Sequence, residues 1–202
     1  MANFRPRELW LPEGIPSEEI SNLLDEAREL GVSVIYRKAG DVFYFGGAQI
    51  RVLAPIPGAM PSSRSSLARS GTSSRKGEQH RNDESLVMKV VYGKTSALLE
   101  ADAEKPEEKY ISTEDPSADV LKVAHHGSAS STNDDLLAAV RPQFAIISVG
   151  VRNVYHHPRP EVLQRLQRAK VLTYRTDMHG ATSFYLDGKN VTSHAANFTK
   201  FP

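Results

Sequence analysis

Two adjacent histidines, His125 and His126, stand where a run of strand-forming residues gives way to a Gly-Ser turn, in the stretch VLKVAHHGS. Neighbouring side chains of a strand point to opposite faces, so both imidazoles can serve one site only if the backbone turns there. Gly127 and Ser128 are residue types that permit such a turn. Paired imidazoles in this position raise the prospect of metal binding or of proton transfer.

Other polar side chains also follow predicted strands. Asp102 ends the strand ALLEAD, and the loop VRNVYHHP, which contains His157, follows the strand AIISVG. Loops at the carboxyl ends of strands converge on one edge of an open α/β sheet, where ligands collect. Asp102, His125 and His126 at such an edge predict a metal site, because carboxylate and imidazole groups bind zinc or manganese. Taken one by one, however, the same residues also suit an ordinary turn aspartate and exposed histidines.

His157 is a separate candidate, because it precedes a proline in a loop rather than ending a strand. An imidazole there can act as a proton donor or as a phosphate contact. Its position alone favours neither role.

The composition narrows the classes of function. The chain has 202 residues, with 25 basic and 24 acidic side chains, so no overall charge indicates a nucleic-acid or membrane partner. It contains no cysteine, which excludes a disulfide scaffold and a thiolate-bound metal and leaves the cellular compartment undecided. No apolar run reaches the roughly 18 residues of a membrane span. Any metal must therefore be held by nitrogen and oxygen ligands.

The elements that must position these side chains alternate between strands and helices, which predicts a layered α/β fold. A strand, a helix with Ser17 as its N-cap and a second strand are expected first. Hairpins should then turn at Gly46-Gly47 and at Tyr92-Gly93-Lys94. The predicted strand segments cover 7–14, 32–37, 40–55, 84–104, 118–128, 143–150, 171–177 and 180–188, and the predicted helices cover 16–31, 132–142 and 158–170.

Two segments depart from this pattern. Residues 57–81 are rich in Ser, Gly and Pro and are predicted to be a flexible insertion. From Ser62 to Arg81 this insertion holds five basic residues against one acidic residue, a local net charge of +4, so a mobile basic flap that contacts phosphate is the alternative. Residues 189–202 are expected to form a frayed tail, which leaves one domain over 1–188.

Three blocks carry a family resemblance. They are NDESLVMKVVYGKTSALLEADAE, VLKVAHHGSASSTNDDLLAAVRPQFAIISVG and NVYHHPRPEVLQRLQRAKVLTYRTDMHGA, in this order over roughly residues 82–187. The chain resembles the metallo-β-lactamase-fold domain of ComEC-type DNA-internalisation competence proteins and their soluble relatives. The upstream residues 3–55 also fit the middle of that domain.

This resemblance implies a four-layer αββα sandwich with a dinuclear zinc or manganese site at one edge. Such a site lowers the pKa of a bridging water, and the resulting hydroxide attacks a phosphodiester or another ester. By position, Asp102 matches the bridging carboxylate, and His126 or His125 matches the late histidine ligand. His157 matches the histidine of the downstream loop, which assists the leaving group or grips phosphate. Ser128 would shape the turn that brings the two imidazoles to one site.

The sequence also departs from the family pattern. No HxHxDH motif, the first metal motif of the family, is present anywhere. Glu100-Ala101 precede Asp102 where the family usually has Thr-Gly, which places bulk and a charge beside the carboxylate. We therefore expect either an N-terminally truncated copy of the sandwich, which is inactive in this form, or a degenerate homologue without catalysis, and the retained polar residues favour truncation. A partner domain would supply the missing half.

Three functions follow from these observations. The first is a metal-dependent phosphodiesterase or nuclease related to DNA uptake, using Asp102, His125, His126 and His157. The second is a non-catalytic remnant that binds a partner domain or nucleic acid through the basic stretch from Arg64 to Arg81. The third is a lactamase or thioesterase, which the same fold and metal would also support.

Overall fold

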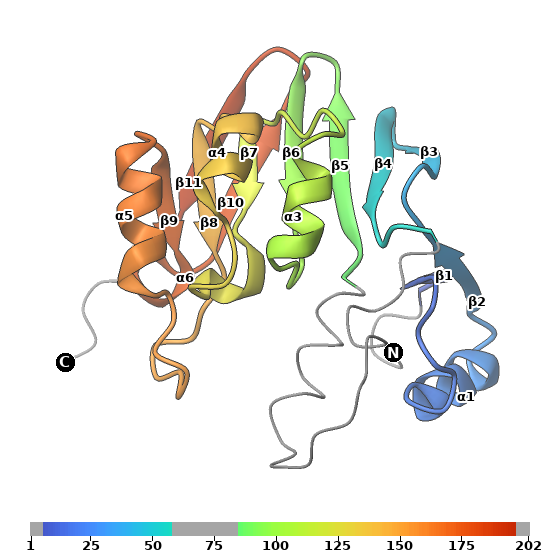
Figure 1. Cartoon of the computed structure of the whole chain (residues 1–202). Helices are drawn as coiled ribbons and strands as arrows, with labels where there is room; N and C mark the ends of the chain where they lie inside the picture. The colour runs from blue at the N-terminus through green and yellow to red at the C-terminus, as the bar shows by residue number, and fades with distance from the viewer. Residues whose placement is uncertain (1–5, 58–84, 197–202) are drawn as a thin grey trace.

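A seven-stranded mixed sheet forms the centre of the computed structural model, which describes residues 6–57 and 85–196 (Figure 1). The strand order in this sheet is β3-β4-β5-β6-β7-β8-β9. The α/β class predicted from the sequence is confirmed. The strands are β3 (Val42–Phe45), β4 (Ala48–Ala54), β5 (Val87–Tyr92), β6 (Thr95–Leu99), β7 (Val120–Lys122), β8 (Phe144–Ile147) and β9 (Leu172–Arg175).

The direction of the strands changes at β6. Strands β3 to β6 are antiparallel neighbours joined by hairpins, and the turns fall at Gly46-Gly47 and Gly93 as predicted. Strands β6 to β9 are parallel. The carboxyl ends of β6, β7 and β8 therefore meet at one edge, where the loops that hold Asp102, the histidine pair and His157 begin.

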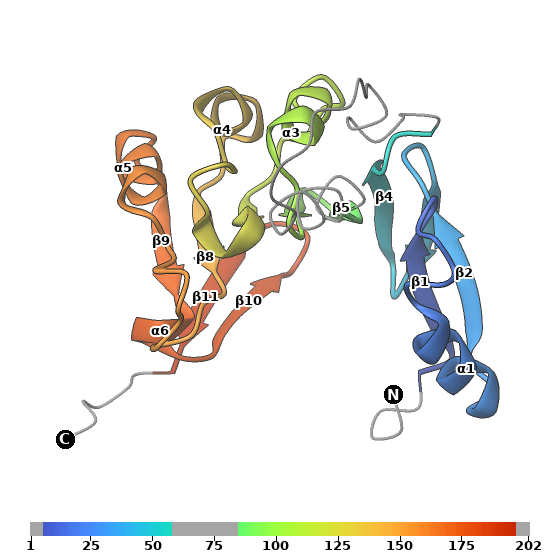
Figure 2. The same cartoon turned by 60° about the horizontal axis from the view of Figure 1, so that its bottom comes forward.

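Three helices cover one face of the parallel strands, as Figure 2 shows. Each helix lies in the connection between two parallel strands, which is the usual way to join such strands. Their apolar sides pack on Leu98, Leu121, Ala145 and Ile147 of the sheet, and these residues belong to one buried core. The helices are α3 (Lys105–Ile111), α4 (Asp134–Val140) and α5 (Pro160–Arg168).

A second β layer lies on the opposite face of the sheet. It is the antiparallel hairpin of β10 (Thr182–Leu186) and β11 (Val191–Ala195). The Phe184 ring packs on the rings of Phe144 and Tyr174, with centroid distances of 5.8 and 5.6 Å. The predicted frayed tail from residue 189 is therefore wrong for β11, whose backbone is paired with β10 along its length.

The first elements form a separate strand–helix–strand unit, as predicted. Strands β1 (Glu8–Pro12) and β2 (Ser33–Arg37) are parallel neighbours joined by α1 (Ser21–Glu29). The unit contacts the main sheet through Trp10, whose ring centroid lies 4.4 Å from that of Phe43. Helix α1 begins at Ser21, with Ile20 at the N-cap, so the prediction of Ser17 as N-cap is wrong.

Two short helices of the structure differ from the elements expected from the sequence. Helices α3 and α6 (Thr176–His179) were not predicted from the sequence, although α3 carries a capping box of Glu104 and Glu107. The predicted insertion lies outside the described residues except at residue 57, and so does the basic stretch within it. Within the described ranges, no helix is long and apolar enough to cross a membrane.

Candidate active site

The histidine pair lies in a tight turn, η1 (Ala124–Gly127), directly after β7. His125, His126 and Gly127 have φ values of +44°, +54° and +84°, so three consecutive residues occupy the left-handed region. For residues other than glycine this conformation costs roughly 1–2 kcal/mol each. The turn answers the question raised by the sequence, because it ends the alternation of the strand and leaves the two ring centroids 6.3 Å apart.

Asp102 approaches one of the two histidines. It follows β6 in a turn where Ala101 has a φ of +49°, and its backbone N–H donates to Ser85 Oγ at 3.2 Å. The carbonyl of Ala101 accepts from the N–H of His125 at 3.0 Å, which joins the two turns. Asp102 Oδ1 then lies 4.0 Å from His126 Nε2. The neighbouring parallel strands thus bring these two predicted residues together.

The contacts of His126 define its tautomer. Nδ1 lies 2.7 Å from the backbone oxygen of Ser148, which can only accept a hydrogen bond. Nδ1 therefore carries the proton, and Nε2 of the neutral ring keeps its lone pair on the side of Asp102. Such a backbone contact fixes the ring in one orientation, as it does for histidines that bind metals or transfer protons.

His125 has a different partner. Its Nδ1 lies 3.3 Å from Glu104 Oε1, and its ring lies 5.9 Å from the ring of His157 between centroids. Glu104 was not among the predicted site residues, although it stands two positions after Asp102. It is the N-cap of α3, which was itself not predicted.

The predicted metal ligands do not form a complete site. Asp102 and His126 are donors of the right chemical type, whereas Nδ1 of His125 lies 3.3 Å from Glu104 Oε1. Among the described residues, no group of three or more histidine, aspartate or glutamate side chains is placed to hold a metal ion. The metal site expected from Asp102, His125 and His126 therefore stays a prediction, since two converging donors are fewer than zinc sites require.

His157 lies in the loop between β8 and α5, and Asn153 fixes the shape of this loop. The Asn153 side chain accepts from the N–H of His157 at 2.8 Å, and its amide donates to the carbonyls of His157 at 2.8 Å and Gly150 at 3.1 Å. His157 Nδ1 is buried and has no hydrogen-bond partner among the described residues. Burial, with a contribution from nearby His125, lowers the pKa of His157 below its ordinary value of 6.5. This ring is therefore neutral at pH 7.

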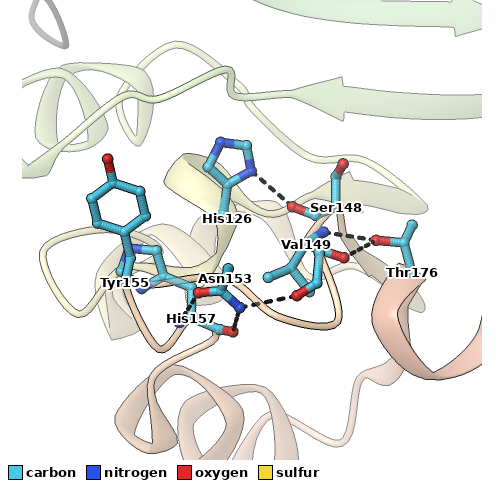
Figure 3. Close-up of a pocket in the computed structure, with 8 residues that line it drawn as sticks. His126, Ser148, Val149, Asn153, Tyr155, His157 and Thr176 are labelled. Atoms are coloured by element: carbon cyan, nitrogen blue, oxygen red, sulfur yellow. Dashed lines mark hydrogen bonds between the residues drawn. The ribbon is translucent and has the colours of Figure 1, made fainter.

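His126 and His157 line a shared pocket of about 330 Å³ (Figure 3). Thr176 closes one side, because its hydroxyl donates to the carbonyl of Val149 at 2.8 Å and accepts from the Val149 N–H at 2.7 Å. Sequence reasoning identified the two histidines and missed the other lining residues, although VRNVYHHP was singled out. The pocket is lined by His126, Ser148, Val149, Gly150, Asn153, Tyr155, His157 and Thr176.

The turn η1, which we call the HHG turn after His125, His126 and Gly127, is held on its core side by Glu100, which is fully buried. Glu100 Oε2 accepts from the Ala124 N–H at 3.2 Å and from the Thr132 hydroxyl at 3.4 Å, whereas Oε1 has no partner among the described residues. The sequence-based expectation placed the charge of Glu100 beside Asp102. The side chain instead points into the core and holds the backbone that follows β7.

Burial raises the pKa of Glu100 well above its ordinary value of 4.5, and the neighbouring Glu108 carboxylate raises it further. The folded chain therefore retains a proton that the unfolded chain loses as the pH rises above about 4.5. The free energy of unfolding therefore falls as the pH rises from about 4.5 to the raised pKa of Glu100. Glu100 thus makes the protein less stable towards neutral pH.

The Glu100→Gln variant should remove this dependence. Its free energy of unfolding, relative to that of the natural chain, should rise as the pH increases above about 5, with a slope of at most about 1.4 kcal/mol per pH unit. Urea unfolding followed by circular dichroism at a series of pH values measures the difference. At pH 4, where both side chains are neutral, the two proteins should be similar. Parallel stability curves across the whole range would contradict the raised pKa.

A second pair of charges holds the loop after the HHG turn, and we call Glu108 and Arg165 the loop clamp. The Glu108 carboxylate accepts from the backbone N–H groups of Thr132 and Asn133, the latter at 3.0 Å. Arg165 of α5 donates to the carbonyls of Thr132 at 2.6 Å, Ser131 at 2.8 Å and Ala129 at 3.1 Å. Glu108 of α3 thus binds backbone N–H groups of this loop, and Arg165 of α5 binds its backbone carbonyls.

The chain is similar over most of its length to proteins named for competence and recombination. It is 35% identical over 187 residues to ComE operon protein 3 of Bacillus subtilis, covering 91% of this chain and 22% of that protein. It is 38% identical over 120 residues to Recombination protein 2 of Haemophilus influenzae, covering 58% of this chain and 15% of that protein. No protein-family model matches the chain.

Two further proteins are similar to parts of the chain. Competence protein ComA of Neisseria gonorrhoeae is 33% identical over 123 residues, covering 59% of this chain and 18% of that protein. A solved structure from Parabacteroides distasonis, described as a metal-dependent hydrolase, overlaps with a TM-score of 0.46 at 12% identity, covering 84% of this chain and 64% of that one. The chain spans less than a quarter of the length of these curated relatives and is homologous to one portion of these competence and recombination proteins.

Proposed function

We propose that Asp102, His126 and His157 form a phosphoester-binding and hydrolytic edge in a competence-associated protein. One observation carries this proposal. His126 lies 4.0 Å from Asp102 and lines the same pocket as His157, so three loops that follow three adjacent strands supply one site. The names of the relatives support a role in competence, and DNA is the phosphodiester that such a role would present.

The side chains suit proton transfer at a phosphoester. His157 is neutral at pH 7 because its pKa is lowered, so it can take a proton at one stage and return it at another. His126 is held by Ser148 with its Nε2 lone pair on the side of Asp102.

The family that this chain resembles uses zinc or manganese, and this chain would supply only some of the ligands of such a metal. Asp102 and His126 are the two donors that this chain would contribute. Further ligands would come from a segment of the HxHxDH type, on a partner domain or in adjoining sequence. This requirement supports weak metal binding by the present chain, since two ligands hold zinc less tightly than four.

The test joins a segment that carries HxHxDH to the N-terminus of this chain. We expect hydrolysis of bis(p-nitrophenyl) phosphate that requires zinc or manganese and that falls at least about 100-fold in Asp102→Ala and in His126→Ala, since even outer-shell partners of a metal commonly matter by 10- to 100-fold. Release of p-nitrophenol gives the rate. The matched control is His194→Ala, which replaces an exposed side chain of β11 and should keep the full rate.

Two results would contradict the proposal. Unchanged turnover in Asp102→Ala and His126→Ala would separate these residues from the chemistry. Turnover of p-nitrophenyl acetate or of a β-lactam, with none of the phosphodiester, would assign the site to a different class of ester.

A further inference from the structure

We infer that Tyr155 is a base-stacking residue, which would make the pocket selective for nucleotides over simple phosphoesters. The inference rests on the proposed phosphoester site and adds the part of the substrate that lies beside the phosphate. It starts from the position of Tyr155 at the pocket, where Figure 3 shows its ring above His157.

The Tyr155 ring is both oriented and open. It lies at 14° to the His157 imidazole, with 6.0 Å between the ring centroids, so the two planes are nearly parallel. The residue is nevertheless 66% exposed. An aromatic ring in this position leaves much of its apolar surface in water, and that surface is available to a planar ligand.

The loop does not depend on Tyr155 for its shape. Asn153 closes it through three hydrogen bonds to the backbone of Gly150 and His157. Because the exposed phenol ring buries little area, replacement of Tyr155 should leave the shape of the loop unchanged.

The size and polarity of the pocket fit one nucleotide. Its volume of about 330 Å³ is at the lower end of the range for small-ligand sites, which begins near 300 Å³. The imidazoles of His126 and His157 give the pocket a polar side, whereas Val149 and Tyr155 offer apolar surface. Arg152, exposed in the same loop, adds positive charge that attracts a phosphate chain.

The consequence is a preference for unpaired bases. Stacking uses the face of a base, which is covered by its neighbours inside a duplex, so a single strand or a frayed end would bind better than paired DNA. Stacking also tolerates any base, because every base has such a face.

The experiment measures binding of three ligands to the full chain by isothermal titration calorimetry. The ligands are inorganic phosphate, ribose 5-phosphate and thymidine 5′-monophosphate. We expect the nucleotide to bind more tightly than ribose 5-phosphate, and Tyr155→Ala to weaken only the nucleotide, by about 5- to 100-fold. Tyr155→Phe should keep the preference. Val151→Ala, which removes another exposed side chain of the loop, is the matched control and should change nothing.

The outcomes separate this inference from the proposed function. Equal affinity for the nucleotide and for ribose 5-phosphate, or an unchanged preference in Tyr155→Ala, would overturn the role of Tyr155 and leave phosphate binding intact. No binding of any of the three ligands would overturn both. Circular dichroism of Tyr155→Ala should match that of the natural chain, because Asn153 still closes the loop.

Discussion

The Gly127→Ala variant is expected to lose roughly 2–4 kcal/mol of unfolding free energy, from overpacking and from a left-handed backbone together. A Cβ at this position would lie 2.6 Å from Cβ and 3.1 Å from Cα of Pro158. The backbone there has a φ of +84°, which alanine tolerates poorly. Urea denaturation followed by circular dichroism measures the loss.

Gly40→Ala is the matched control. Gly40 has a φ of +96°, but a Cβ there meets no atom within 4 Å. This variant should therefore show only the backbone cost, about 1 kcal/mol. If Gly127→Ala costs no more than Gly40→Ala, then the HHG turn is not packed against the loop that contains His157.

The contact between Gly127 and Pro158 also affects the pocket. The carbonyl of Gly127 accepts from the N–H of Arg159 at 2.9 Å, so the turn and the loop are joined by packing and by a hydrogen bond. A methyl group at position 127 must push them apart. Because His126 and His157 stand on either side of this contact, the pocket between them would widen.

Removal of the buried carboxylate in Glu108→Ala is expected to cost roughly 3–5 kcal/mol, as does breaking other buried networks of charged groups. Glu108 is fully buried, and its carboxylate accepts from two backbone N–H groups and from the side-chain amide of Asn133. Without it, the buried N–H of Thr132 loses its partner, and Arg165 loses the opposite charge of the loop clamp.

The comparison with Lys109→Ala isolates this effect. Lys109 is the next residue of α3 and is exposed, so its replacement should change stability by less than about 0.5 kcal/mol. Glu108→Gln should fall between the two, because it keeps one acceptor oxygen but turns an NH₂ group towards N–H donors. Equal stability of Glu108→Ala and Lys109→Ala would mean that the loop is held by other contacts.

Much of the fold could be predicted because apolar residues repeat with the period of each element. The hairpins, the parallel strands and α4 and α5 follow from alternation, glycine turns and helical spacing. Helix α3 was missed because its seven residues, KPEEKYI, contain two adjacent glutamates that are both buried. The Glu108 carboxylate is satisfied by Thr132 and Asn133, more than twenty positions later, and no local pattern reveals such partners.

Part of the candidate site could also be predicted from the sequence. The approach of Asp102 to His126 follows from adjacent parallel strands, whose ends must meet. The separation of His125 from His126 does not, because it depends on two consecutive histidines with positive φ, which sequence preferences do not favour. The role of Asn153 was missed for a related reason, since its three hydrogen bonds all go to the backbone of its own loop.

The most direct test of the shared site is nuclear magnetic resonance of the histidine ring nitrogens during titration with dimethyl phosphate. The free protein should show His126 with its proton on Nδ1. Addition of the phosphodiester should then shift the ring signals of His126 and His157 together, while those of exposed His194 stay in place. A proton on Nε2 of His126, or shifts confined to one of the two rings, would contradict a phosphoester site built from both.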